Sequence, residues 1–221
     1  PTSGLIPHGP SNFPFFNLSV DGPMARNVED LSIFLDAMVD HNKNDPLSSS
    51  KGTSNSYYKN LLKREEAKYL IGFTDDFGIF PCDKEVRSMM HNTLKLVQNL
   101  GHEISNTYPD MSKSEYCFQT LRAYMFYCTY KSLLKKDKSL IKEEVIWNIN
   151  KAKAITIDDL LEAEKARADI YNDTMKFFDK FDFLIVPSSI VPPFNSQDKW
   201  VKKVEDTTFD NYVSWLMIAA S

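Results

Sequence analysis

Apolar side chains recur every three or four residues in several stretches of the chain, the spacing that places them on one face of a helix. Asn27 precedes the first of these stretches and Asp83 the second, and each can cap the first turn of a helix. Gly101 follows the second stretch and is expected to end it. The pattern thus predicts two helices, whose apolar faces are Val28, Leu31, Leu35, Met38 and Val39, and Val86, Met89, Met90, Leu94, Val97 and Leu100.

Three further stretches are expected to be helical. Residues 113–147 have an irregular apolar pattern with clustered Tyr and Phe. A long helix is predicted to open with the capping pair Thr156 and Asp159 and to run to about Phe181. Residues 209–221 are predicted to form an apolar helix that stops without the Gly, Asn or Pro that usually ends one.

Three short apolar runs predict strands at residues 69–73, 102–107 and 183–186. The last run does not alternate apolar and polar residues, and Pro187 ends it. Strands without alternation are usually buried on both faces by helices, so we expect an α/β layered fold. Residues 41–58 are rich in Asn, Ser, Lys and Asp and are expected to form an exposed loop.

Composition narrows the classes of function. The chain has 221 residues, 43% of them hydrophobic, and can bury a sizeable core. The net charge is -4, and the sequence shows no basic face of the kind that binds nucleic acid. No apolar run approaches the ~20 residues that cross a bilayer. Cys82, Cys117 and Cys128 form no CxxC pair, which is typical of free thiols in a reducing compartment, and we therefore expect the cytoplasm.

Few residues point to chemistry on their own. The four histidines lack metal-ligand spacing, and no phosphate-binding or dinucleotide motif occurs, so we expect neither a metal nor a cofactor. Ser188 and Ser189 follow the strand at 183–186. In a parallel α/β sheet, ligands bind beyond this carboxyl end of the strands. A structural turn is the favoured interpretation of these serines, and a loop that faces the substrate is the second. A nucleophile comes last, because the sequence indicates no base to activate it.

Several segments, taken in order, resemble the amidase signature family. Pro1–Gly4 and Gly22–Asp30 are similar to the turn and the helix start that follow the family's Gly/Ser-rich catalytic segment. Phe181–Pro187 is similar to a later strand of the family, and the helix predicted at 209–221 to one near its end. The resemblance implies the C-terminal part of an α/β/α layered fold with a mixed central sheet. Residues 1–221 are then expected to be a single incomplete domain, cut at both ends.

The resemblance also implies an activity, the hydrolysis of an amide C–N bond in a small molecule. In the family a Ser attacks the carbonyl, a second Ser relays the proton, and a Lys is the base. Those residues are expected to lie before Pro1. No catalytic residue is therefore assigned to this chain, and the chain alone is expected to be inactive.

Two positions bear on the choice of amide. Within the family, the glutaminase subunit of glutamyl-tRNA amidotransferase holds glutamine with an Arg after a Glu-Glu-Val stretch and with a later Asp. Here the stretch at 143–145 leads to Trp147 and Asn148, and the late position falls near Trp215 and Leu216. The pocket is thus expected to suit a neutral amide, because burying an unpaired charge is costly. The substrate-pocket candidates are Trp147, Asn148, Ser188, Trp215 and Leu216.

Two other functions stay open at this point. The chain could belong to a non-catalytic scaffold protein that keeps the fold, or to the glutaminase subunit of glutamyl-tRNA amidotransferase. A homodimer is left open as well.

Overall fold

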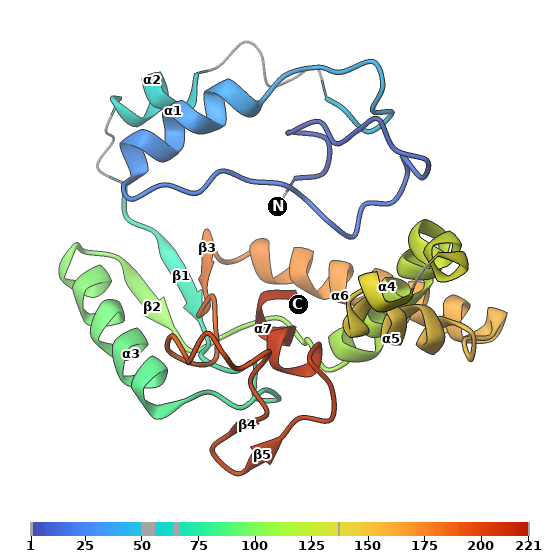
Figure 1. Ribbon diagram of the computed structural model, residues 1–221. Helices are drawn as coiled ribbons and strands as arrows, with labels where there is room; N and C mark the ends of the chain where they lie inside the picture. Colours follow the sequence, from blue (N-terminus) through green and yellow to red (C-terminus); the bar gives the residue numbers. More distant parts are fainter. Residues whose placement is uncertain (1, 50–55, 64–66, 137, 221) are drawn as a thin grey trace. The chain divides into compact units, whose positions relative to one another are not determined.

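The computed structural model describes residues 2–49, 56–63, 67–136 and 138–220. The chain forms two compact units, Pro1–Glu66 and Ala67–Ser221 (Figure 1). The expectation of a single domain over residues 1–221 stays a prediction.

The first unit holds two helices, α1 (Val28–Met38) and α2 (Tyr57–Leu61). Asn27 is the N-cap of α1, as predicted, because its Oδ1 accepts a hydrogen bond of 2.8 Å from the Asp30 amide. Asp36 in α1 accepts from the Ser56 hydroxyl at 2.6 Å and from the Tyr57 amide at 2.7 Å. The hydrogen bond from Ser56 is the main cause of the lowered pKa of this carboxyl.

The prediction of an exposed loop at 41–58 needs correction at two places among the described residues. Tyr57 begins α2, so the helix starts inside the predicted loop, with Ser56 as its N-cap. Asp45 is buried, and its carboxylate accepts hydrogen bonds from the His8 and Leu47 amides. These bonds, that of His8 first, lower the pKa of the Asp45 carboxyl. Residues 50–55 of the predicted loop lie outside the described residues.

The second unit is built on a three-stranded sheet of β1 (Leu70–Phe73), β2 (Glu103–Ser105) and β3 (Phe183–Ile185), in the order β2-β1-β3. Both strand pairs are parallel. A parallel sheet with helical crossovers confirms the predicted α/β class. β3 differs from the prediction that both its faces are buried, because Phe183 is half exposed.

Helices cover the two faces of this sheet. α3 (Lys84–Asn99) packs Val86 and Met90 in a cluster with Ile185 of β3. α6 (Ile157–Phe178) brings Phe177 over Gly72, which pairs with Leu184, the neighbour of Ile185. Successive residues of a strand point to opposite faces, so α3 and α6 lie on opposite sides of the sheet. Figure 1 shows α3 on one side and α6 on the other.

The ends of α3 follow the sequence prediction more closely than its apolar face does. Asp83 caps the helix by accepting from the Glu85 amide at 2.8 Å, and Gly101 follows its end with φ of 91°. Val86, Met90 and Leu94 are buried, as predicted. Met89 and Leu100 are exposed, because only the stripe three and four residues apart meets the sheet.

The helices and turns described within residues 114–136 and 138–152 pack with α6. They comprise α4 (Ser114–Tyr130), two 3-10 turns (Lys131–Lys135 and Lys138–Leu140) and α5 (Glu143–Ala152). Both α5 and α6 contact α4. The capping box of Thr156 and Asp159 opens α6 as predicted, and the helix ends at Phe178, three residues before the expected Phe181.

The predicted helix at 209–221 is wrong for its first five residues, 209–213, and residue 221 lies outside the described residues. A hairpin of β4 (Lys203–Val204) and β5 (Thr207–Thr208) precedes it, and only a 3-10 turn (Ser214–Leu216) and α7 (Met217–Ala220) are helical. The Asn211 side chain accepts from the Val213 and Ser214 amides and holds residues 211–214 in a turn. Val213, Met217 and Ile218 are nevertheless buried in the main core, so the apolar pattern reflects packing.

The cysteines are free, as expected, and Cys82 and Cys117 are buried. Burial raises the pKa of the Cys82 thiol to about 11, so the thiol is neutral near pH 7 and serves as a small apolar group. None of the helices in the described ranges has both the length and the apolar character needed to span a bilayer.

Candidate substrate pocket

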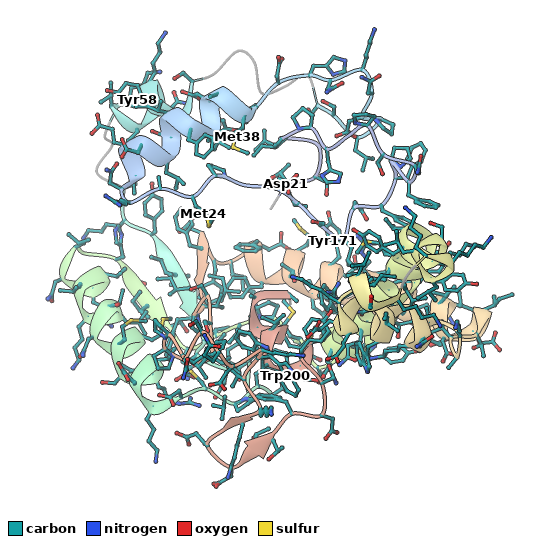
Figure 2. The ribbon with its side chains drawn as sticks, in the orientation of Figure 1. Asp21, Met24, Met38, Tyr58, Tyr171 and Trp200 are labelled. Atoms are coloured by element: carbon teal, nitrogen blue, oxygen red, sulfur yellow. The ribbon has the colours of Figure 1, made fainter. Side chains whose placement is uncertain are left out.

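Two adjoining cavities lie beside the start of α5, and we call them together the α5 hollow. Their volumes are about 580 Å³ and about 170 Å³. Both are lined by Glu143, Glu144, Trp200 and Tyr212, and Trp147 lines the smaller one. Trp200, labelled in Figure 2, comes from the segment before β4, so the hollow joins distant parts of the second unit.

A hydrogen-bond network fixes Tyr212 in this wall. The Tyr212 oxygen accepts a hydrogen bond of 2.8 Å from Arg122 Nη2 and one of 2.6 Å from Asn148 Nδ2. Asn148 is buried, and its Nδ2 also donates to the Glu144 carbonyl at 2.7 Å. The phenol oxygen of Tyr212 is therefore fixed by hydrogen bonds from two donors, one of which is charged.

Aromatic and cationic contacts surround this network. The rings of Trp147 and Tyr212 meet edge to face with centroids 5.8 Å apart. The Arg122 guanidinium lies 4.2 Å from the centre of the Phe126 ring, and Lys151 Nζ lies 5.0 Å from that of Trp147. Burial lowers the pKa of the Lys151 ammonium. The Arg122 guanidinium also lies 5.7 Å from the centre of the Tyr212 ring, so both cations support the aromatic wall through contacts with its rings.

A second network ties α4 to the turn before α7. Ser214 Oγ donates to the Glu115 carboxylate at 2.6 Å and accepts from Asn211 Nδ2 at 3.1 Å. Gln119 bonds to Glu115 at 2.7 Å and receives a hydrogen bond from the Lys151 ammonium. This network stabilises the turn that carries Tyr212.

The rim of the hollow carries both acidic and basic side chains. Lys199 Nζ and Glu143 Oε2 form an exposed ion pair of 2.9 Å, which lowers the pKa of Glu143 and raises that of Lys199. Glu144 and Asp210 also line the hollow, as does Lys142. Three carboxylates against two ammonium groups favour a ligand without net negative charge.

A second hollow lies after β3 and is mainly apolar. Its volume is about 730 Å³, and its lining includes Ser188, Met89 and Phe194. Ser189 bonds to the backbone of Val191, which makes it part of a structural turn. Ser188 is exposed at the wall of this hollow.

The five predicted pocket residues fall in different places. Trp147 lines the α5 hollow, and Asn148 lies behind its wall. Ser188 lines the second hollow, and Trp215 packs edge to face on Phe194 of that hollow at 5.5 Å. Leu216 is partly exposed and lines neither hollow, and the buried Nε1 of Trp215 has no acceptor among the described residues. Whether any of them binds substrate stays a prediction.

Sequence reasoning missed three residues of the α5 hollow and its support, Arg122, Trp200 and Tyr212. The sequence pattern places Tyr212 in a predicted helix. Only the resemblance of that helix to one of the amidase signature family connects this residue with function. Arg122 meets it across 90 residues of sequence, and Trp200 lies in a Lys-rich segment that carries no motif. Only the tertiary fold brings these side chains together.

Comparison with known proteins identifies the family. The chain matches the model of the Amidase family over residues 1–221, and it belongs to the amidase signature family. Its second unit and the α5 hollow are thus parts of an amidase fold.

Individual relatives cover different shares of the chain. An acylamidase of Rhodococcus erythropolis is 24% identical over 190 residues, which are 85% of this chain and 39% of the relative. A glutamyl-tRNA(Gln) amidotransferase subunit of Helicobacter pylori (strain G27) is 36% identical over 83 residues, 38% of this chain and 17% of the relative.

A solved structure extends the likeness to the whole chain. A bacterial aryl acylamidase of the amidase signature enzymes superposes with a TM-score of 0.82 at 17% identity, covering 100% of this chain and 48% of that one. At this identity the likeness shows the fold alone. The chain spans less than half the length of these relatives.

Proposed function

We propose that the complete protein hydrolyses the C–N bond of a neutral, non-peptide amide. The observation that carries the proposal is the match to the amidase family along the whole of residues 1–221. The acylamidase similar over 85% of the chain supports the substrate class, because its name specifies an acyl amide.

The α5 hollow supports a neutral substrate. After the Glu-Glu-Val stretch at 143–145, where the resemblance to the glutaminase subunit leads one to expect Arg, this chain has Trp147 and Asn148, and the Asn148 amide is engaged with Glu144 and Tyr212. The Arg122 guanidinium donates to Tyr212, and Lys199 is paired with Glu143. A free amino acid would bring a carboxylate and an ammonium into this wall, where Arg122 and Lys199 already have partners, at a cost in desolvation.

The proposed reaction passes through an acyl-enzyme on a serine. A serine of the complete protein adds to the amide carbonyl, and the amine leaves with a proton delivered through a second serine and a lysine. Water then releases the acid and frees the serine. No described residue of this chain is given a catalytic role, and the chain's part is to shape and line the pocket.

The glutaminase subunit is the second candidate, favoured by the 36% identity to the Helicobacter pylori protein over 83 residues. The lack of an Arg in residues 146–148 argues against it, since the resemblance leads one to expect a cation after the Glu-Glu-Val stretch at 143–145. The free cysteines support a reducing compartment such as the cytoplasm for either enzyme.

Replacement of the nucleophile tests the mechanism. In the complete protein, a change to Ala of the serine at the family's nucleophile position should lower kcat for a neutral amide by at least ~10³-fold, since the acyl-enzyme cannot form. Amine release measures the rate, and mass spectrometry of the wild type should detect the added acyl group. Unchanged turnover in the variant contradicts the serine mechanism, and no turnover of any amide by the wild type favours the scaffold function.

A further inference from the structure

The Tyr212 hydroxyl has more hydrogen-bonding capacity than its partners use. A phenol oxygen accepts through its lone pairs and donates one hydrogen. Arg122 Nη2 and Asn148 Nδ2 both donate to this oxygen, at 2.8 Å and 2.6 Å. Two donors occupy its accepting sites, so its own hydrogen must point to a different group.

The direction of the Asn148 amide is fixed by a second contact. Its Nδ2 lies 2.7 Å from the Glu144 carbonyl oxygen, a contact that only the NH₂ side of the amide can make. Asn148 is therefore a donor to Tyr212 and cannot accept the phenol hydrogen by an amide flip. Within the described ranges, the Tyr212 hydroxyl donates to no other group.

The surroundings of Tyr212 specify what could accept that hydrogen. Tyr212 lines both cavities of the α5 hollow, beside Trp147 and Trp200. Indole rings favour planar apolar ligands, and the surplus of carboxylates at the rim disfavours anions. Donation from Arg122 to the phenol oxygen polarises the O–H bond and makes it a stronger donor.

We propose that the α5 hollow binds a neutral aromatic ligand through its rings, and that the Tyr212 hydroxyl donates a hydrogen bond to an oxygen acceptor on that ligand. For an amidase, this ligand is an amide that carries an aryl group. The assignment of an amide rests on the proposed function, whereas the hollow, the donor and the ligand chemistry rest on the geometry of Tyr212.

The test compares two ligands that cannot be hydrolysed. Acetophenone has a ring and a carbonyl oxygen, and ethylbenzene has the ring without the acceptor. Their Kd values for the complete protein are measured by NMR titration of the tryptophan indole N–H signals. The wild type should bind acetophenone about tenfold more tightly, the effect of one net hydrogen bond, and the signals of Trp147 and Trp200 should shift.

Three variants separate the donor from the rings. Tyr212→Phe should weaken acetophenone about tenfold and leave ethylbenzene unchanged. Trp200→Leu should weaken both ligands equally, because it removes a ring and no donor. Tyr171→Phe removes the same atom from an exposed tyrosine of α6, labelled in Figure 2, and should change neither Kd.

Several results would overturn the proposal. Unchanged acetophenone affinity in Tyr212→Phe, or equal loss of both ligands, shows that the hydroxyl is no donor to the ligand. If Tyr212→Phe does not fold, Arg122→Met keeps the hydroxyl and frees one accepting site, so the preference for acetophenone should fall, and an unchanged preference contradicts the proposal. A protein that binds as expected but cleaves no amide contradicts the proposed function alone.

Discussion

Gly72→Ala is expected to destabilise the second unit by about 3 kcal/mol. Gly72 lies in the central strand β1, and a Cβ there would come within 2.4 Å of Phe177 Cζ and 2.5 Å of the Thr107 carbonyl oxygen. A side chain can rotate away, but the Thr107 oxygen belongs to the backbone that follows β2. The added methyl group must therefore push the strand away from its neighbours.

The urea midpoint of the complete protein measures this effect. Gly22→Ala is the matched control, because a Cβ at Gly22 meets no atom within 4 Å, and its midpoint should stay near that of the wild type. Adding Phe177→Leu to Gly72→Ala should not restore stability, since the contact with Thr107 remains. A Gly72→Ala protein as stable as the control would show that the sheet and α6 are not packed this closely.

Phe177→Ala is expected to cost about 3–5 kcal/mol, the range for a buried phenylalanine. The ring is 6% exposed and stacks on Phe181, with centroids 4.6 Å apart. It also fills the space over Gly72, so its removal leaves a cavity between α6 and the sheet.

The adjacent residue supplies the control for this change. Phe178 is 42% exposed, and Phe178→Ala should cost about 1 kcal/mol or less. Both variants remove the same atoms from neighbouring positions of α6, so helix propensity affects them alike. Equal shifts in the urea midpoint would contradict the burial that separates the two rings.

Features set by neighbouring residues could be predicted from the sequence. Asn27, Asp83 and Thr156 cap their helices as expected, because a capping side chain needs only amides two or three residues away. The strands predicted at 69–73 and 183–186 agree with the structure within one or two residues. These local signals, with the family resemblance, were enough for the α/β class.

Features set by tertiary contacts could not be predicted. Residues 209–213 have an apolar pattern that fits a helix, yet Asn211 binds the following amides and makes a turn. The α5 hollow needs Tyr212 beside α5 and Trp200 beside both, and no spacing in the sequence encodes that meeting. The sequence singles out Asn148, but the contact of this residue with Tyr212 depends on the fold.

The selectivity of the complete protein between acetanilide and free glutamine tests the proposed function most directly. The ratio of kcat/KM values, measured from the release of aniline and of ammonia, should favour acetanilide by about 100-fold or more, because glutamine would leave two charges without partners. Trp147→Ala should lower the value for acetanilide by removing a ring of the hollow. Efficient glutamine hydrolysis that survives Trp147→Ala, with no cleavage of acetanilide, would contradict a neutral-amide hydrolase.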